Sequence, residues 1–304
     1  RINLVHGLWV LHGWQVFCEQ KERNMKGRVI PTDQLPFYDS SQRRLAIIED
    51  AVELYRYRDL LYSLVQRDLT VRYKRSVLGF LWTMLNPLLT MIVMTIVFST
   101  LFRFQIEHYP VYLLSGLLIW NFFSQSTFQA VDSLVWGGGL ISKIYLPKSV
   151  FVVSAVLVGL VNLLLALIPL FLIMFATGQP LTWALLFLPV PLVLTCFLTL
   201  GVGLFVAAIA VFFSDVAEIY RVGLTIVMYL TPIFYPASIV PERFAVFLRL
   251  NPIYYFIELF RVPIYQGQLP DLSILICASL IAVGSLLVGW WFFTRKADEF
   301  AYRV

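Results

Sequence analysis

The fold is decided by one uncharged stretch, residues 149–214, which reads SVFVVSAVLVGLVNLLLALIPLFLIMFATGQPLTWALLFLPVPLVLTCFLTLGVGLFVAAIAVFFS. A helix that crosses the ~30 Å hydrocarbon core of a membrane needs roughly 20 apolar residues, because each residue adds about 1.5 Å. The stretch is too long for one crossing, and Thr177-Gly178-Gln179-Pro180 supplies turn residues near its middle. It therefore predicts two consecutive transmembrane helices.

Four further segments have the composition of membrane spans. Residues 77–102 and 109–131 carry no charge, and residues 272–294 are likewise uncharged. Residues 216–232 admit only Glu218 and Arg221, both near the start of the segment. We therefore expect an all-α membrane protein with six transmembrane helices, and an even number of spans puts both ends of the chain on the same side.

The composition excludes an ordinary soluble domain, because 60% of the residues are hydrophobic and only 13% are charged. Its 23 Lys and Arg residues exceed its 18 Asp and Glu residues, but most of the positive charge precedes residue 76 or flanks an apolar segment. Lys and Arg near span ends stay on the cytoplasmic side. This indicates a multi-pass protein with both termini in the cytoplasm, not a nucleic-acid binder. Arg243, Arg249 and Arg261 fall outside and are exceptions.

The region before the first span divides into two parts. Residues 1–46 are expected to be a cytoplasmic segment, of which residues 1–24 precede Met25 and are interpreted as a leader. Residues 47–76 predict an amphipathic helix at the membrane interface, and residues 77–304 form the transmembrane domain. The alternative for residues 47–76 is a helix on a small soluble domain. The helix predicted for residues 47–76 has an apolar face and an opposite polar face. The apolar face consists of Leu54, Leu61, Val65 and Leu69, and the polar face of Arg56, Asp59, Ser63 and Arg67.

The outer segment, residues 234–271, is broken by five prolines. Between them, residues 242–250 and 253–265 are predicted to form two short helices rich in aromatic side chains. Two explanations stay open. The helices either dip back into the outer leaflet or form an ordered extracellular cap.

The search for catalytic chemistry is negative. Gly137-Gly138-Gly139 lacks the Lys-Ser/Thr that follows the glycines of a phosphate-binding loop. The histidines are His6, His12 and His108, and the three cysteines are widely spaced, so we expect no catalytic residue, no metal site and no cofactor.

Ionisable residues near the predicted cytoplasmic ends of the spans form a candidate entrance. Glu218 and Arg221 are three residues apart on one helical face, so they can pair. The functional interpretation is a polar opening for a charged substrate, and the alternative is a self-neutralising pair that orients the helix. Asp132, late in the second span, is a further charge in an apolar setting. The candidate entrance consists of Arg67, Arg72, Lys74, Arg75, Asp215, Glu218 and Arg221.

Aromatic residues make up 16% of the chain. Their faces stack on the apolar faces of sugar rings, which suits a channel for a sliding polymer, while the alternative is an aromatic belt at the membrane interface. The candidate channel and gate aromatics are Trp120, Phe123, Tyr229, Tyr235, Tyr254 and Tyr255.

A short loop between the second and third spans, residues 139–148, has basic ends, an apolar centre and a helix-stopping Pro147. It is either a docking site for a partner protein or a plain connector at the membrane surface.

Several motifs, in this order, resemble the ABC-2-type permeases that export bacterial polysaccharides such as O antigens, capsules and teichoic acids. The similarity begins near Arg67 and continues to the C-terminus. The matching residues are Arg67-Asp68, Arg72-Tyr73-Lys74, Ser76, Leu78-Gly79, Trp82, Asn86-Pro87, Leu114-Ser115-Gly116-Leu117, Trp120, Leu140-Ile141-Ser142-Lys143-Ile144-Tyr145-Leu146-Pro147-Lys148, Phe213-Ser214-Asp215-Val216, Thr231-Pro232-Ile233-Phe234-Tyr235-Pro236 and Asn251-Pro252. One departure is Ser214, where family members often carry Arg before the Asp.

The resemblance implies a six-span subunit that forms a homodimer in the bacterial cytoplasmic (inner) membrane. Two separate ABC ATPase subunits would bind ATP and Mg, and the cargo would be a glycan linked to undecaprenyl phosphate or pyrophosphate. Residues 238–268 resemble the family's extracellular gate helices, and residues 47–76 its interface helix. The implied coupling residues, which would contact the ATPase, are Ser142, Lys143, Tyr145, Pro147 and Lys148.

From the sequence we therefore expect the chain to be a channel-forming export permease that changes no bond in its substrate. One alternative is a membrane-embedded glycosyl or acyl transferase, for which only the corner at Asp215 and Glu218 offers acidic groups. The other alternative is an ABC-2 permease for a small drug or lipid.

Overall fold

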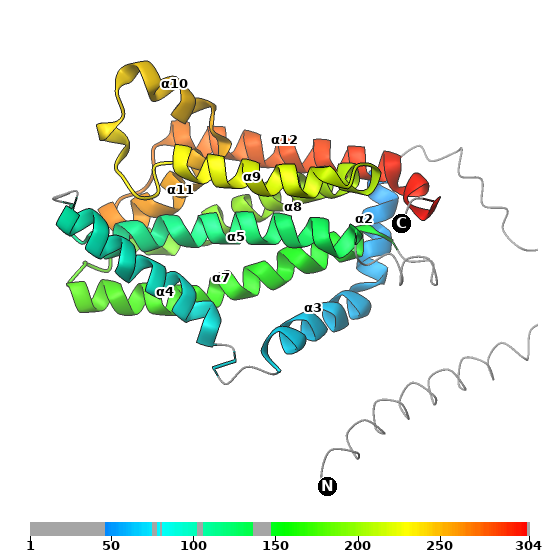
Figure 1. Ribbon diagram of the computed structural model, residues 1–304, viewed down its shortest axis with the longest axis horizontal. Helices are drawn as coiled ribbons and strands as arrows, with labels where there is room; N and C mark the ends of the chain where they lie inside the picture. Colours follow the sequence, from blue (N-terminus) through cyan, green and yellow to red (C-terminus); the bar gives the residue numbers. More distant parts are fainter. Residues whose placement is uncertain (1–45, 75–77, 80, 102–105, 136–146, 303–304) are drawn as a thin grey trace, which may run out of the picture. The chain divides into compact units, whose positions relative to one another are not determined.

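A computed structural model describes residues 46–74, 78–79, 81–101, 106–135 and 147–302. Within these ranges the regular secondary structure is entirely helical, and the predicted all-α class is confirmed (Figure 1). The α-helices are α2 (Ala46–Arg56), α3 (Arg58–Tyr73), α4 (Leu81–Ile96), α5 (Tyr109–Val135), α7 (Ser149–Thr177), α8 (Pro189–Phe212), α9 (Asp215–Leu230), α10 (Glu242–Leu250), α11 (Pro252–Arg261) and α12 (Leu272–Lys296). Short 3-10 or π turns occupy Val97–Leu101, Trp183–Phe187, Ala237–Ile239, Val262–Gln266 and Ala297–Tyr302.

The predicted division of residues 149–214 into two helices is confirmed. Helix α7 ends at Thr177 because Gly178 adopts a left-handed conformation (φ 73°) that glycine takes without a steric penalty. The Gln179 N–H donates to the Met174 carbonyl over 2.9 Å, which closes the end of the helix. Helix α8 then starts at Pro189, where the missing N–H of proline costs no hydrogen bond.

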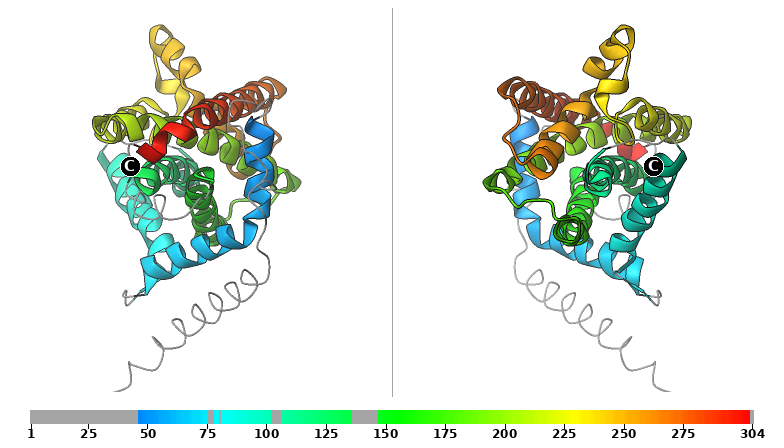
Figure 2. Two further views of the ribbon diagram at one scale, coloured as in Figure 1. Left: turned by 90° about the vertical axis from the view of Figure 1, so that its right-hand side faces the viewer. Right: turned by 90° about the vertical axis from the view of Figure 1, so that its left-hand side faces the viewer.

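Four helical segments are long and apolar enough to cross a membrane: Leu81–Ser99, Ser149–Thr177, Trp183–Phe212 and Leu272–Lys296. Helix α5 has 27 residues, but polar side chains along one face make it less apolar than these four. Helix α9 has only 16 residues and carries Glu218 and Arg221. Both nevertheless lie alongside the long helices, where α9 contacts α5 and α8 (Figures 1 and 2).

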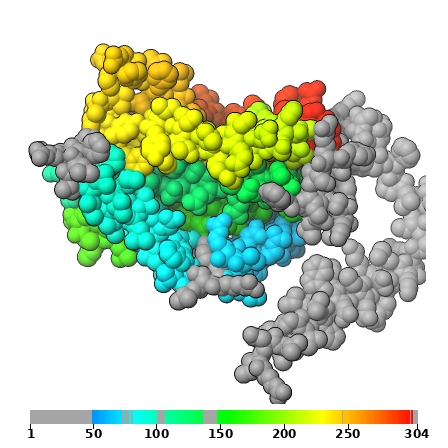
Figure 3. Space-filling model, in the orientation of Figure 1, coloured from blue at the N-terminus to red at the C-terminus, as the bar shows by residue number. Residues whose placement is uncertain are grey.

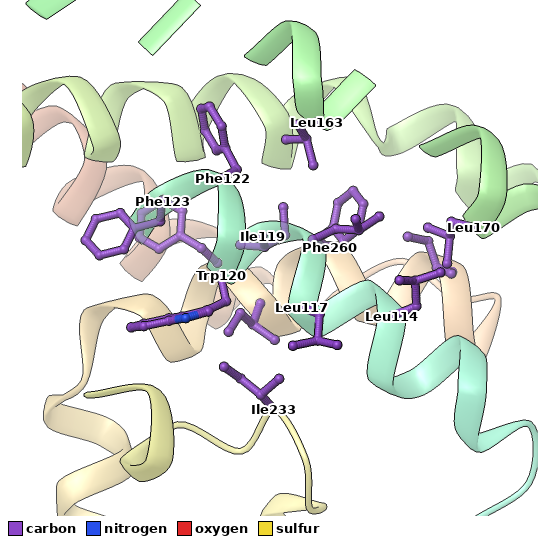
Figure 4. Close-up of a cluster of buried hydrophobic side chains, with 14 of the residues drawn as sticks. Leu114, Leu117, Ile119, Trp120, Phe122, Phe123, Leu163, Leu170, Ile233 and Phe260 are labelled. Atoms are coloured by element: carbon purple, nitrogen blue, oxygen red, sulfur yellow. The ribbon is translucent and has the colours of Figure 1, made fainter. Parts of the chain in front are cut away.

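Helix α5 is the centre of the bundle. It contacts α4, α7, α8, α9 and α11, and most of its side chains are buried. Figure 4 shows how residues distant in the sequence meet around it. The labelled side chains are Leu114, Leu117, Ile119, Trp120, Phe122 and Phe123 of α5, Leu163 and Leu170 of α7, Phe260 of α11, and Ile233 of the turn after α9.

The segment predicted as one amphipathic helix forms two helices, α2 and α3, which meet at Tyr57 (φ −92°, ψ 21°). The bend directs α2 against α12 and α7, while α3 packs on α7. On α3 the predicted faces hold, since Leu61, Val65 and Leu69 are half-buried. The four polar residues of the opposite face, Arg56, Asp59, Ser63 and Arg67, are exposed.

The outer segment contains the two short helices predicted from its prolines. Helix α10 is largely exposed and extends away from the long helices, whereas α11 packs against α5, α8 and α12 (Figure 1). Asn251 joins them and caps α11, because its Oδ1 accepts a hydrogen bond from the Ile253 N–H over 3.2 Å. The end of α11 continues into the π turn Val262–Gln266.

The contact between α8 and α12 depends on two glycines that let the backbones touch. A Cβ added to Gly201 would collide with the backbone of Ser285, and one added to Gly289 would collide with the backbone of Gly201. Ser285 and Gly289 are four residues apart, the small-xxx-small spacing of close helix pairs in membranes.

We predict that Gly289→Ala separates α8 from α12 and destabilises the protein by about 1–3 kcal/mol, the usual cost of overpacking. Thermal unfolding of the purified protein in detergent measures this effect. The matched control is Gly284→Ala on the same helix, where an added Cβ meets nothing within 4 Å. Equal unfolding temperatures for the two variants would contradict the role of the glycine contact.

Candidate functional site

A stripe of polar side chains runs along α5, formed by Asn121, Gln125, Gln129 and Asp132. Their spacing of four, four and three residues places them on one helical face. Gln125 is exposed and the other three are half-buried, whereas the apolar side chains of the same helix are mostly buried. Polar groups at membrane depth are costly unless they face protein or a water-filled space. The stripe therefore marks the surface of α5 that faces a polar space.

The first cavity lies on the side of the stripe that faces α3, α4 and α7, and its volume is about 590 Å³. Arg72 of α3, Trp82 and Asn86 of α4, and Asn162 of α7 line it together with the stripe. Four helices from separate parts of the sequence thus line one open cavity, whose wall combines polar and apolar side chains. In the space-filling view the surface of α5 is visible between α9 on one side and α4 and α3 on the other (Figure 3).

The second cavity lies between α5 and α9 and has a volume of about 250 Å³. It is lined by Trp120 and Ser124 of α5 and by Arg221 and Met228 of α9. Gln125 and Phe128 line both cavities. The polar stripe therefore borders two spaces, one on each flank of α5.

Two of the predicted entrance residues reach α5. The Arg72 guanidinium donates from Nη2 to Gln129 Oε1 over 2.8 Å. The Arg221 guanidinium carbon lies 4.5 Å from the centre of the Phe128 ring, and Arg221 also pairs with Glu218 at 3.2 Å, as its spacing predicts. Both cations thus border the α5 stripe.

The other entrance residues are distributed along the surface. Arg67 is exposed and pairs with its neighbour Asp68 at 2.9 Å, while Lys74 and Asp215 are exposed. Within the described part of the chain, none of these three makes a hydrogen bond or ion pair with α5. Arg75 lies outside the described residues.

The predicted channel aromatics occupy two settings. Trp120 and Phe123 pack in the core with ring centres 6.2 Å apart, although Trp120 also borders the second cavity. Tyr229 is 63% exposed. Tyr235 donates its hydroxyl to the Tyr229 carbonyl over 3.1 Å.

Tyr254 and Tyr255 lie on α11, with their rings 5.6 Å apart in an edge-on arrangement. The Tyr255 hydroxyl donates to the Arg249 carbonyl over 2.9 Å, which ties α11 to the end of α10.

The turn after α9 is held by buried side chains from α5 and α11. Tyr109 donates to the Phe234 carbonyl over 2.7 Å, and Tyr112 donates to the Tyr235 carbonyl over 2.9 Å. Arg261, only 2% exposed, donates to the Pro232 carbonyl and pairs with Glu258, each at 3.0 Å. Arg261 is therefore buried inside the protein and is not a charge on an exposed loop. It no longer counts as an exception to the rule that Lys and Arg near span ends stay on the cytoplasmic side.

Removing Arg261 should destabilise the protein strongly, because Glu258 and the turn carbonyls lose their buried donor. We predict that Arg261→Met lowers the free energy of unfolding by about 3–5 kcal/mol. The control is Arg221→Met, which breaks an exposed pair of the same spacing and should cost at most about 1 kcal/mol. Unfolding in detergent, followed by circular dichroism, compares the two, and equal losses would refute the structural role of Arg261.

Two of the five predicted coupling residues, Pro147 and Lys148, are described, and they lie at the opposite end of the bundle. Ser142, Lys143 and Tyr145 fall outside the described residues. Pro147 is buried, and the Lys148 ammonium donates to the Ala297 carbonyl over 2.5 Å and lies 5.4 Å from the centre of the Phe300 ring. Lys148, the last residue of the predicted coupling segment, is thus attached to the turn that follows α12.

Asp50 of α2 connects the same region to two long helices. Its Oδ1 accepts a hydrogen bond from the Ser149 hydroxyl over 3.0 Å, and its Oδ2 accepts one from the Trp290 indole N–H over 2.9 Å. Ser149 is the first residue of α7, directly after Lys148, and Trp290 lies near the end of α12. Asp50 of α2 therefore connects the first residue of α7 to the end of α12.

We predict that Asp50→Ala releases α2 from α7 and α12, since the Ser149 and Trp290 donors lose their acceptor at a cost of about 1–3 kcal/mol. Hydrogen–deuterium exchange should show faster exchange in α2. Asp59→Ala is the control, because the Asp59 side chain is 98% exposed. Unchanged exchange in α2 of the Asp50 variant would show that these two bonds do not hold the helix.

Sequence reasoning missed most of the α5 stripe, together with Asp50 and the turn-holding role of Arg261. The stripe had a usable signal, namely amides at four-residue spacing inside an apolar helix. Asp50 had none, because its partners lie 99 and 240 residues away.

These features define a multi-pass membrane protein with a polar path along one central helix. The sequence matches the family described as ABC-2 type transporter over residues 59–265, and the chain belongs to this family.

Three named transport proteins are similar to this chain over most of its length. The chain is 36% identical over 252 residues to the O-antigen export system permease protein RfbA of Myxococcus xanthus, covering 82% of this chain and 96% of that protein. It is 30% identical over 247 residues to the permease of the same name from Klebsiella pneumoniae, covering 80% and 94%. The polysialic acid transport protein KpsM of Escherichia coli is 22% identical over 240 residues, covering 75% and 89%. The resemblance found in the sequence motifs is confirmed.

Proposed function

We propose that this chain is the permease subunit of an ABC transporter that exports a lipid-linked polysaccharide across the bacterial cytoplasmic membrane. The observation that carries the proposal is the similarity to O-antigen export permeases over nearly their full length. The polar stripe on α5 adds physical support, because a glycan crossing the membrane needs polar partners along its path. The glycan would be of the O-antigen, capsule or teichoic-acid type.

In this proposal the protein has six spans, with α5 and α9 as the second and fifth. Helix α5 is long enough, since 27 residues extend about 40 Å at 1.5 Å per residue. Helix α9 is shorter, and the turn from Thr231 to Tyr235 that follows it is partly buried and continues it toward α11. Both termini would be cytoplasmic, because Lys148, Arg295 and Lys296 share one end of the bundle with Asp50.

The channel would be formed by two copies of the chain. Helix α9 has no buried residue, and its exposed side chains include Ile219, Val222 and Ile226. The surface of α5 is visible between α9 and α4 (Figure 3), and the exposed Gln125 of the stripe lines the cavities on both of its flanks. Lipid cannot solvate that stripe, so a second copy placed over this face would close a polar passage away from the hydrocarbon. Tyr254 and Tyr255 on α11 would act as aromatic gate residues at the outer end.

Energy would come from two ABC ATPase subunits, which would hold ATP and Mg, while this chain would bind no cofactor and catalyse no reaction. The ATPase would contact residues 139–148, with Ser142, Lys143 and Tyr145 as coupling residues. Lys148 and Ser149 support this assignment, because their bonds to Ala297 and Asp50 carry a displacement of the segment into the bundle.

The test is reconstitution of the permease with its ATPase in liposomes that contain the lipid-linked glycan. We predict ATP-dependent export, and we expect Lys143→Ala combined with Tyr145→Ala to reduce it more than about tenfold, as loss of interface hot spots does. The amount of permease inserted in the membrane should stay the same.

The matched control replaces Arg58 and Tyr62 by Ala, since both side chains are exposed on α3 and neither belongs to the candidate entrance. Export at the normal rate by the Lys143/Tyr145 variant would contradict the coupling assignment. Absence of ATP-dependent export by the unaltered complex would contradict the proposed function itself.

A further inference from the structure

The cavity on the α3, α4 and α7 side of α5 has the size and lining of a ligand site. Its volume of about 590 Å³ falls within the roughly 300–1,000 Å³ of small-molecule sites. Five side-chain amides line it. They come from three helices and are Asn86, Asn121, Gln125, Gln129 and Asn162.

The charges in this lining cancel. Among its described residues only Arg72 and Asp132 are charged, and they have opposite signs. The Arg72 guanidinium is already hydrogen-bonded to Gln129. An anion entering the cavity would therefore meet one engaged cation and one carboxylate. The lining instead suits an uncharged polar ligand.

Ser126 forms part of the cavity wall with its hydroxyl turned toward α7. Ser126 lines the cavity and is 1% exposed, and its Oγ has no hydrogen-bond partner among the described residues. Gly159 of α7 faces it, and an added Cβ there would collide with the Ser126 hydroxyl. The glycine thus leaves room for the hydroxyl at the wall of the cavity.

The chemistry of the lining matches a sugar ring. Amides both donate and accept hydrogen bonds, and so do sugar hydroxyls. Trp82 is 48% exposed and Phe128 is half-buried, so both offer aromatic faces to the apolar side of a ring. Few other neutral ligands combine many hydroxyls with apolar ring faces.

We propose that this cavity binds an uncharged sugar unit of the exported glycan. The assignment rests on the proposed function and adds the recognising residues and a preference for neutral sugars. Asn121 and Gln125 contribute hydrogen bonds from α5, and Trp82 stacks on the ring.

The experiment measures binding to the purified permease–ATPase complex in a detergent without sugar headgroups. The probe is the glycan released by mild acid from the producing cells and labelled at its reducing end, and fluorescence anisotropy gives its Kd. Asn121→Leu and Gln125→Leu should each raise this Kd about tenfold, because the hydroxyls of the bound sugar lose a hydrogen-bonding amide. Gln66→Leu on the exposed face of α3 is the control and should leave the Kd unchanged.

A second probe, undecaprenyl phosphate without sugar, distinguishes a phosphate site from a sugar site. The proposal expects this lipid not to compete with the glycan, and expects Arg72→Gln to change glycan binding less than Gln125→Leu does. Competition that disappears in Arg72→Gln would overturn the sugar assignment in favour of an anion site.

The two proposals fail in different ways. If the unaltered complex exports and binds the glycan, and Asn121→Leu and Gln125→Leu bind it equally well, only the cavity assignment falls. If the unaltered complex neither exports nor binds the glycan, the proposed function falls and the cavity assignment with it.

Discussion

Hydrocarbon cannot solvate an amide or a carboxylate, and the arrangement of this bundle follows from that constraint. Helix α5 carries Asn121, Gln125, Gln129 and Asp132 on one face, so the face cannot lie against lipid at low cost. The other faces of α5 are apolar and are covered by α7, α8 and α11. Helices α7, α8 and α12 are the least polar and are apolar enough to lie against lipid. The most polar long helix is accordingly the most central one.

The two ends of the bundle are held by different chemistry. At one end, buried phenols and the Arg261 guanidinium bind the carbonyls of an irregular turn, which would otherwise be unsatisfied. At the other end, Asp50 and Lys148 connect α2, α7 and the chain after α12. Between these ends, the polar face of α5 stays open on both flanks. This combination suits a transport protein, since helices fixed at their ends transmit a displacement while the middle accommodates cargo.

Much of the fold followed from local sequence. The uncharged runs located the long helices, the turn at Gly178 separated α7 from α8, and the prolines bounded α10. The pairing of Glu218 with Arg221 also followed, because three residues along a helix determine the distance between two side chains. The bend at Tyr57 did not follow, because α2 turns there to reach α12, a contact made across the whole length of the chain.

The sequence by itself thus determined the helical class, most helix bounds, and the family through its ordered motifs. These properties depend on hydropathy and turn residues, which act within a few positions along the chain. Only the tertiary structure decided which polar side chains share a cavity, that Arg261 is buried, and that Asp50 joins α7 to α12. Such relations depend on how helices pack, and packing brings together residues whose separation in the sequence carries no local signal.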